Sequence, residues 1–236
     1  MTLETIDAPD MRTAWTSALR LLMQSSPRYS LLVNISDPCL VPERDLLALD
    51  PQLFSSRAKP LLDVAATIFP QRRPHDPSDA HQFLNAKLKA YKRWKRRSPT
   101  TWGTYFGRLV SFGDSELNQL MRCINALNGW AQSQRAALTL HLASPEYDKP
   151  RAQGQPCWHF GEFLREGDDT LSLLAVYRSH DYFLKALGNF IGLSRLLKFV
   201  SHHTEMKVGR LICVSSYATL GCSKHVAREM LEEAST

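Results

Sequence analysis

Cys157 is the side chain with the clearest potential for chemistry in this sequence, because a thiolate is a strong nucleophile. It follows Pro156 and precedes Trp158. A lone cysteine is more often a small buried hydrophobic residue, and the residue type alone leaves that alternative open. An arginine close to such a thiol would favour the thiolate and would also bind phosphate through its planar donors. The sequence around Cys157 must therefore decide between the two alternatives.

An ordered series of short motifs surrounds Cys157. From Cys157 onward the sequence reads PC…LS…YRSHDYFL…GN…KVG, and residues 103–107 upstream read GTYFG. This series resembles that of the thymidylate synthases and the related pyrimidine-nucleotide hydroxymethylases, over about residues 10 to 225. The resemblance implies a thymidylate synthase-like α+β fold with a mixed sheet and packed helices, in a single domain spanning residues 1–236.

The resemblance also implies a mechanism. The thiolate of Cys157 would add to C6 of a uracil-type ring in a pyrimidine nucleotide, so that C5 can attack a one-carbon unit from 5,10-methylenetetrahydrofolate. Methylation and hydroxymethylation both fit this scheme. The sugar-binding segment of the family does not match here, which indicates a specialised pathway and not housekeeping thymidylate synthesis.

Several polar residues match positions that bind ligands in the family. Asn189 matches the asparagine that pairs with the uracil edge, and Asp181 matches an aspartate that contacts folate. The matched arginine of the turn at residues 133–135 reaches across from the partner subunit in the family, so a homodimer is expected. Surface charge, helix capping and local hydrogen bonding remain the alternatives for single residues in this set. The residues that match phosphate-side positions are Arg28, Arg135, Arg178 and Ser179.

The proton-transfer groups depart from the family pattern. The family tyrosine falls on Phe106 and the family histidine on Trp158, so the neighbouring Tyr105 and His159 become the candidates for these roles. The family glutamate falls on Asp63 or Val64, and Asp63 is the candidate carboxylate. In addition, two family sugar contacts fall on Thr219 and Gly221, and the chain ends at Thr236, before the segment that closes over folate in the family.

Two alternatives to folate-dependent transfer therefore stay open. One is a diverged enzyme that keeps thiol addition to C6 without folate. The other is a non-catalytic nucleotide-binding protein, in which the basic segment at residues 87–97 could hold nucleic acid. That segment contains no acidic residue, yet a solvated helix face explains it better, so nucleic acid is not an expected partner.

The elements that must position these residues follow from hydrophobic periodicity. Helices are expected over residues 11–23, 80–97, 117–130 and 183–203, and in pieces over 45–68, where Pro51 and Pro60 interrupt the pattern. Strands are expected over 29–35, 136–142, 170–176 and 211–215. Residues 70–79 contain three prolines and are expected to form a loop or lid.

Composition limits the remaining possibilities. With 236 residues and 44% hydrophobic content, the chain can bury one large core. It has no apolar run long enough to span a bilayer and no apolar signal core near its start, which favours a cytoplasmic protein. Its five cysteines include no CxxC pair, so free thiols and no metal site are expected.

Overall fold

The centre of the protein is a seven-stranded mixed sheet with the strand order β1-β2-β7-β5-β4-β3, to which β6 adds by pairing with β7. The computed structural model describes residues 3–24, 27–50, 59–70, 79–97, 102–129, 138–148 and 154–234. β7 is antiparallel to β2 and parallel to β5 and β6. The strands are β1 (Glu4–Ala8), β2 (Arg28–Ile35), β3 (Leu138–His141), β4 (Trp158–Glu166), β5 (Thr170–Tyr177), β6 (His180–Asp181) and β7 (Lys207–Thr219).

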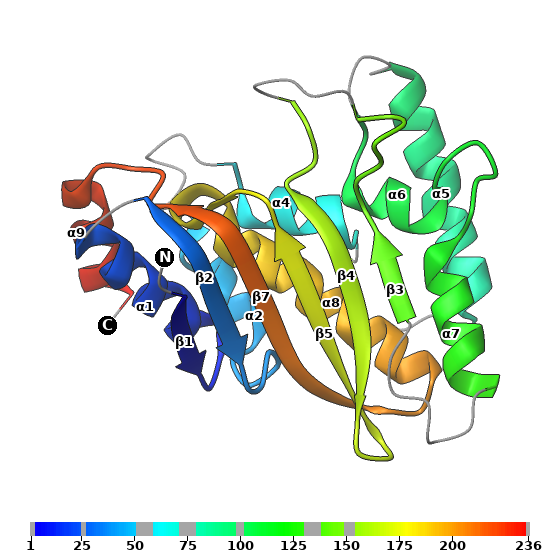
Figure 1. The fold of residues 1–236 in the computed structure, drawn as a ribbon, viewed down its shortest axis with the longest axis horizontal. Coiled ribbons are helices and arrows are strands. Elements are labelled where there is room, and N and C mark those ends of the chain that lie inside the picture. Colours follow the sequence, from blue (N-terminus) through cyan, green and yellow to red (C-terminus); the bar gives the residue numbers. More distant parts are fainter. Residues whose placement is uncertain are drawn as a thin grey trace.

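Helices pack on one face of this sheet. Figure 1 shows α8 passing behind the central strands, and α1 contacts α8, β1 and β2. The chain thus has the expected α+β architecture of a mixed sheet with packed helices. The helices are α1 (Met11–Gln24), α2 (Glu43–Leu47), α4 (Leu61–Ile68), α5 (Ala80–Arg97), α6 (Tyr105–Val110), α7 (Gln119–Gly129), the π-helix η1 (Tyr182–Ala186), α8 (Leu187–His203) and α9 (Lys224–Glu233).

The two faces of the sheet differ in burial. Successive side chains of a strand point to opposite faces, and one set, which includes Leu211 and Cys213, is fully buried. The alternate set is only half-buried although its centre is apolar. Within this second set Val176 lies opposite both Phe160 and Val214, so the apolar residues are contiguous across three strands.

Two glycines bring α8 close to α4 and thereby fix where α8 begins. A Cβ on Gly188 would lie 2.6 Å from Cβ of Val64, and one on Gly192 would lie 2.8 Å from the carbonyl oxygen of Ala65. Any side chain at these positions would push the helices apart. The packing of α4 therefore sets the position of Asn189, the residue that follows Gly188.

The periodic segments were predicted correctly, with shifts at their ends. Helices α1 and α5 and strands β2 and β5 confirm their predicted segments within one residue. Helix α7 begins at Gln119 and not at Leu117, because Asn118 caps it by accepting the N–H of Met121 and Leu117 instead pairs with Phe112. The predicted helix start at Phe183 falls within η1, and β7 extends beyond residues 211–215 at both ends.

Some segments were missed or fall outside the description. The short strand β1, the long strand β4 and helices α6 and α9 were not predicted. Helices α2 and α4 confirm the interrupted pattern between residues 45 and 68, whereas Pro51 lies outside the described residues. Residues 71–78 of the predicted loop also lie outside them.

Candidate functional site

Cys157 lies immediately before β4, and Tyr105 of α6 holds its backbone. The Tyr105 hydroxyl accepts the N–H of Cys157 at 3.0 Å and that of Trp158 at 3.2 Å. On the other side, the N–H of Arg178 donates to the carbonyl oxygen of Cys157 at 2.9 Å. Two elements far apart in sequence thus fix the backbone around the thiol. Tyr105 therefore positions Cys157, while its own hydroxyl is engaged by the protein.

The thiol is half-buried, and its surroundings act on its ionisation in opposite directions. Burial raises the pKa of Cys157 above its ordinary value, and the nearby Arg178 guanidinium partly offsets that rise. Burial and Arg178 both lower the pKa of His159, so its imidazole is neutral at pH 7. Burial also raises the pKa of Tyr105 to about 12. In this state Cys157 is protonated, and a neutral imidazole lies two residues away in the chain.

His159 and Arg178 converge on one backbone oxygen. Nε2 of His159 lies 3.2 Å from the carbonyl oxygen of Pro156, and Nε of Arg178 donates to the same oxygen at 3.1 Å. Within the described part of the chain, the two terminal nitrogens of Arg178 and the hydroxyl of Ser179 have no hydrogen-bond partner. These donors remain available to an anion beside the thiol.

The sheet register brings Arg28 into the same region. Arg28 of β2 and His180 of β6 both lie opposite Ala218 of β7, so the three residues form one row across adjacent strands. At the usual strand spacing the backbones of Arg28 and His180 are about 10 Å apart. The side chain of Arg28 is outside what the structure describes, as is Arg135 with its whole turn.

Trp158 and Asn189 are part of the interior. Trp158 is fully buried, its Nε1 donates to the carbonyl oxygen of Phe160 at 2.7 Å, and its ring packs against Tyr105 and Tyr177. Asn189 is 6% exposed, and its amide nitrogen lies 3.0 Å from Nε2 of His180. Sequence reasoning gave this histidine no role, because it stands in the polar stretch at residues 178–181, where nothing local indicates burial.

Asp181 caps η1 and fills the space beside Gly221. Its Oδ1 accepts the N–H of Leu184 at 2.8 Å, and burial raises the pKa of its carboxyl group. Gly221 has a φ of +82°, and a Cβ there would collide with the Asp181 carboxylate. Asp181 therefore acts as a helix cap in the structure, which is the alternative considered for it from the sequence. Only glycine at position 221 leaves room for this carboxylate.

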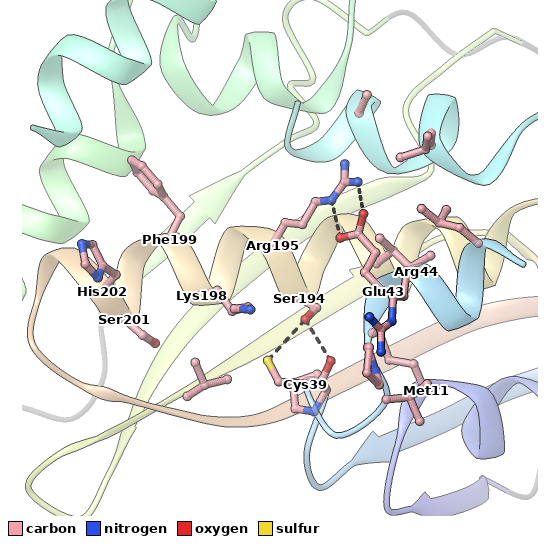
Figure 2. Close-up of a pocket in the computed structure, with 18 of the residues that line it drawn as sticks. Met11, Cys39, Glu43, Arg44, Ser194, Arg195, Lys198, Phe199, Ser201 and His202 are labelled. Atoms are coloured by element: carbon pink, nitrogen blue, oxygen red, sulfur yellow. Dashed lines mark hydrogen bonds and ion pairs between the residues drawn. The ribbon is translucent and has the colours of Figure 1, made fainter. Parts of the chain in front are cut away.

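Asp63 lies in a different place from Cys157. It is exposed on α4 and lines a pocket of about 1250 Å³ between α2, α4 and α8 (Figure 2). The polar centre of this pocket is an ion pair between Arg195 and Glu43, in which Nε of Arg195 donates to Oε2 of Glu43 at 2.9 Å. Val64, the other position considered for the carboxylate, packs against Gly188. The structure does not bring Asp63 to the thiol.

The remaining predicted features are placed as follows. All five cysteines are free. Among the described residues there is no group of three metal-binding side chains, and no helix is long and apolar enough to cross a bilayer. On α5, Lys87 places its ammonium over the ring of Phe83, Lys92 pairs with Glu116 at 2.5 Å, and Trp94 is 42% exposed.

A family model described as thymidylate synthase matches residues 75–229, which is more than half of the chain. The matched range includes Cys157, Arg178 and Asn189, whereas Arg28 lies before it. No curated protein matches the chain.

Proposed function

We propose, because the chain belongs to the thymidylate synthase family, that it is a one-carbon transferase acting on C5 of a uracil-type nucleotide with Cys157 as the nucleophile. One observation carries this proposal. Beside the Cys157 thiol, Arg178 is held by the carbonyl oxygen of Pro156 through Nε, and its two terminal nitrogens have no partner among the described residues. A thiol beside a guanidinium group whose two terminal nitrogens can bind a phosphate suits a substrate that has both a phosphate and an electrophilic ring.

The reaction would begin with addition of sulfur to the ring. The Cys157 thiol gives up its proton, for which the neutral imidazole of His159 is the candidate base, and a bond forms between Sγ and C6. The π electrons of the C5=C6 bond move toward C5 and the O4 oxygen, which makes C5 nucleophilic. After C5 has gained its substituent and lost its proton, the sulfur leaves and the double bond returns.

5,10-Methylenetetrahydrofolate would supply the one-carbon unit when bound. Asp181 is the residue matched to folate contact, and its carboxylate already faces the backbone N–H groups of Leu184 and Phe183. A carboxylate has about four lone-pair sites, so it could still accept a ligand N–H. The carboxylate therefore fits a folate contact while it caps η1.

Mass spectrometry of a covalent adduct tests the proposal. Incubation with 5-fluoro-dUMP and methylenetetrahydrofolate is expected to add the mass of both ligands to the protein, because fluorine at C5 blocks the proton loss that releases the enzyme. The variant Cys157→Ser should form no adduct, whereas the matched control Cys222→Ser should react like the wild type. If the wild-type chain remains unmodified with both uracil and cytosine 5-fluoronucleotides, the proposal is wrong.

A folate-independent thiol addition is the second candidate. The burial of Asp181 and its use as a helix cap favour it, because they commit part of the expected folate contact to the protein itself. The same experiment separates the two functions. An adduct that contains nucleotide alone, and forms equally well without methylenetetrahydrofolate, supports the second candidate.

A homodimer through the half-buried face of the sheet is part of the proposal. The contiguous apolar residues Phe160, Val176 and Val214 give this face the character of an interface between subunits. Light scattering should give twice the chain mass for the wild type and the single mass for Val214→Arg. The control Leu62→Arg, on an exposed helix position, should leave the dimer intact. A monomeric wild type would refute this assembly.

A further inference from the structure

Four polar side chains form a chain of contacts inside the protein, next to the candidate site. The amide nitrogen of Asn189 lies 3.0 Å from Nε2 of His180, and Nδ1 of His180 lies 3.1 Å from Oγ of Ser215. The Ser215 hydroxyl in turn lies 3.1 Å from the hydroxyl of Tyr182. His180, Ser215 and Tyr182 are at most 2% exposed. Asn189 is the member nearest to the surface at 6%.

His180 is held neutral and in one orientation. Its ring stacks on that of Tyr177 with centroids 4.2 Å apart and an angle of 5°, and the edge of Phe190 closes another side. This burial lowers the pKa of His180 to about 3. A neutral imidazole has one N–H and one lone pair. Because the Asn189 amide donates to Nε2, the proton lies on Nδ1 and is donated to Ser215.

This arrangement leaves a defined set of groups on Asn189. One of its two amide N–H groups is used by His180, so the other N–H and the carbonyl oxygen remain. That oxygen has no hydrogen-bond partner within the described ranges. If the amide turned by half a rotation, its oxygen would face the lone pair of Nε2. In this tautomer that contact is repulsive. The turned amide would need the proton on Nε2 and a Ser215 hydroxyl that donates to Nδ1, so Asn189 can turn only if the imidazole and Ser215 rearrange with it.

Resting on the proposed function, in which Asn189 faces the base, we propose that His180 is a positioning residue that selects a uracil-type base over a cytosine-type base. Uracil offers a donor at N3 and an acceptor at O4, which match the free oxygen and the free N–H of Asn189. Cytosine offers the reverse pattern, with an acceptor at N3 and a donor at N4. Cytosine would therefore need the turned amide, which His180 disfavours.

The test is the ratio of affinities for two probes, 5-fluoro-dUMP and 5-fluoro-dCMP, measured on the full chain by calorimetry. The wild type should prefer the uracil probe. His180→Leu removes the acceptor and fills its place with an apolar side chain, so Asn189 can turn. The preference should then fall about tenfold, the value of roughly one hydrogen bond. His180→Gln offers both an acceptor and a donor, so it can bond to either orientation of the Asn189 amide and should also lower the preference.

Tyr182→Phe is the matched control, because it shortens the far end of the chain and leaves the contact between His180 and Asn189 in place. Its base preference should equal that of the wild type. If His180→Leu keeps the full preference for uracil, the role of His180 is refuted while the proposed function stands. A wild type that binds neither probe overturns the proposed function and this inference together.

A second measurement needs no variant and decides the matter if His180→Leu does not fold. Long-range proton–nitrogen NMR correlation on chain labelled with ¹⁵N-histidine reports which ring nitrogen of a neutral histidine carries the proton. The expected result for His180 is a proton on Nδ1 and a bare Nε2. A proton on Nε2 would place the oxygen of Asn189 against His180 and reverse the predicted base preference, which would overturn the inference.

Discussion

Replacing Gly221 by alanine should destabilise the protein for two separable reasons. The first is backbone strain, because Gly221 has a φ of +82°, and an L-residue in that region costs about 1–2 kcal/mol. The second is the collision of the new Cβ with the Asp181 carboxylate, which must move and give up its cap on the N–H of Leu184. Loss of such a cap costs about 1 kcal/mol. The expected total is therefore about 2–3 kcal/mol.

Urea unfolding of the wild type and four variants measures these two parts. Gly167→Ala is the control for strain alone, because Gly167 has a similar φ of +67° with no atom within 4 Å of a Cβ there. Gly221→Ala should lose about 1 kcal/mol more than this control. The double variant Asp181→Ala/Gly221→Ala should cost less than the sum of its single variants, because alanine at 181 removes the collision. Equal losses for the two glycine variants, or strict additivity, would refute the claim that Asp181 occupies this space.

Three further predictions concern the thiol and two buried contacts. Arg178→Ala should raise the pKa of Cys157 further, so alkylation of Cys157 by iodoacetamide at pH 8 should slow severalfold, whereas Arg178→Lys should react near the wild-type rate. An unchanged alkylation rate in Arg178→Ala would show that Arg178 does not act on the thiol. Tyr105→Phe leaves two backbone N–H groups without their acceptor and should lower the free energy of unfolding by about 1–3 kcal/mol in urea, whereas a loss below measurement error would contradict the bonding described. Glu43→Gln leaves the buried Arg195 without its carboxylate and should lower the free energy of unfolding by about 1–3 kcal/mol. This loss is smaller than for a fully buried pair, because the Glu43 side chain is 39% exposed. Arg44→Gln, on the exposed surface, should lower it far less.

The sequence predicts elements well where periodicity is strong and local. Helix α5 spans the residues expected, because its amphipathic pattern continues over 18 residues and is therefore easily recognised. Strand β4 was missed although it is nine residues long, because glycine and charged residues interrupt its apolar alternation. Its stability comes from pairing with β3 and β5, which a local pattern does not contain.

The candidate site is predictable in its residues more than in its geometry. Cys157 and Arg178 lie side by side in the structure, because a backbone hydrogen bond joins the carbonyl oxygen of Cys157 to the N–H of Arg178. The positions of Asp63 and Asp181 depend on contacts between segments distant in sequence. Asp63 lies on the face of α4 that lines the pocket with α2 and α8. The carboxylate of Asp181 occupies the space that a side chain at Gly221 would need. Neither contact leaves a local signature.

The long central strand β7 has a consequence for how the site responds to thermal opening. β7 is paired with β2 on one side and with β5 and β6 on the other, so its amides should be among the last to exchange with solvent deuterium. Arg28 and His180 are both joined to this strand at Ala218. The frame that carries them is therefore already assembled before any ligand arrives, and binding has little backbone order left to create there. Affinity at this end of the site should depend on side-chain chemistry more than on folding.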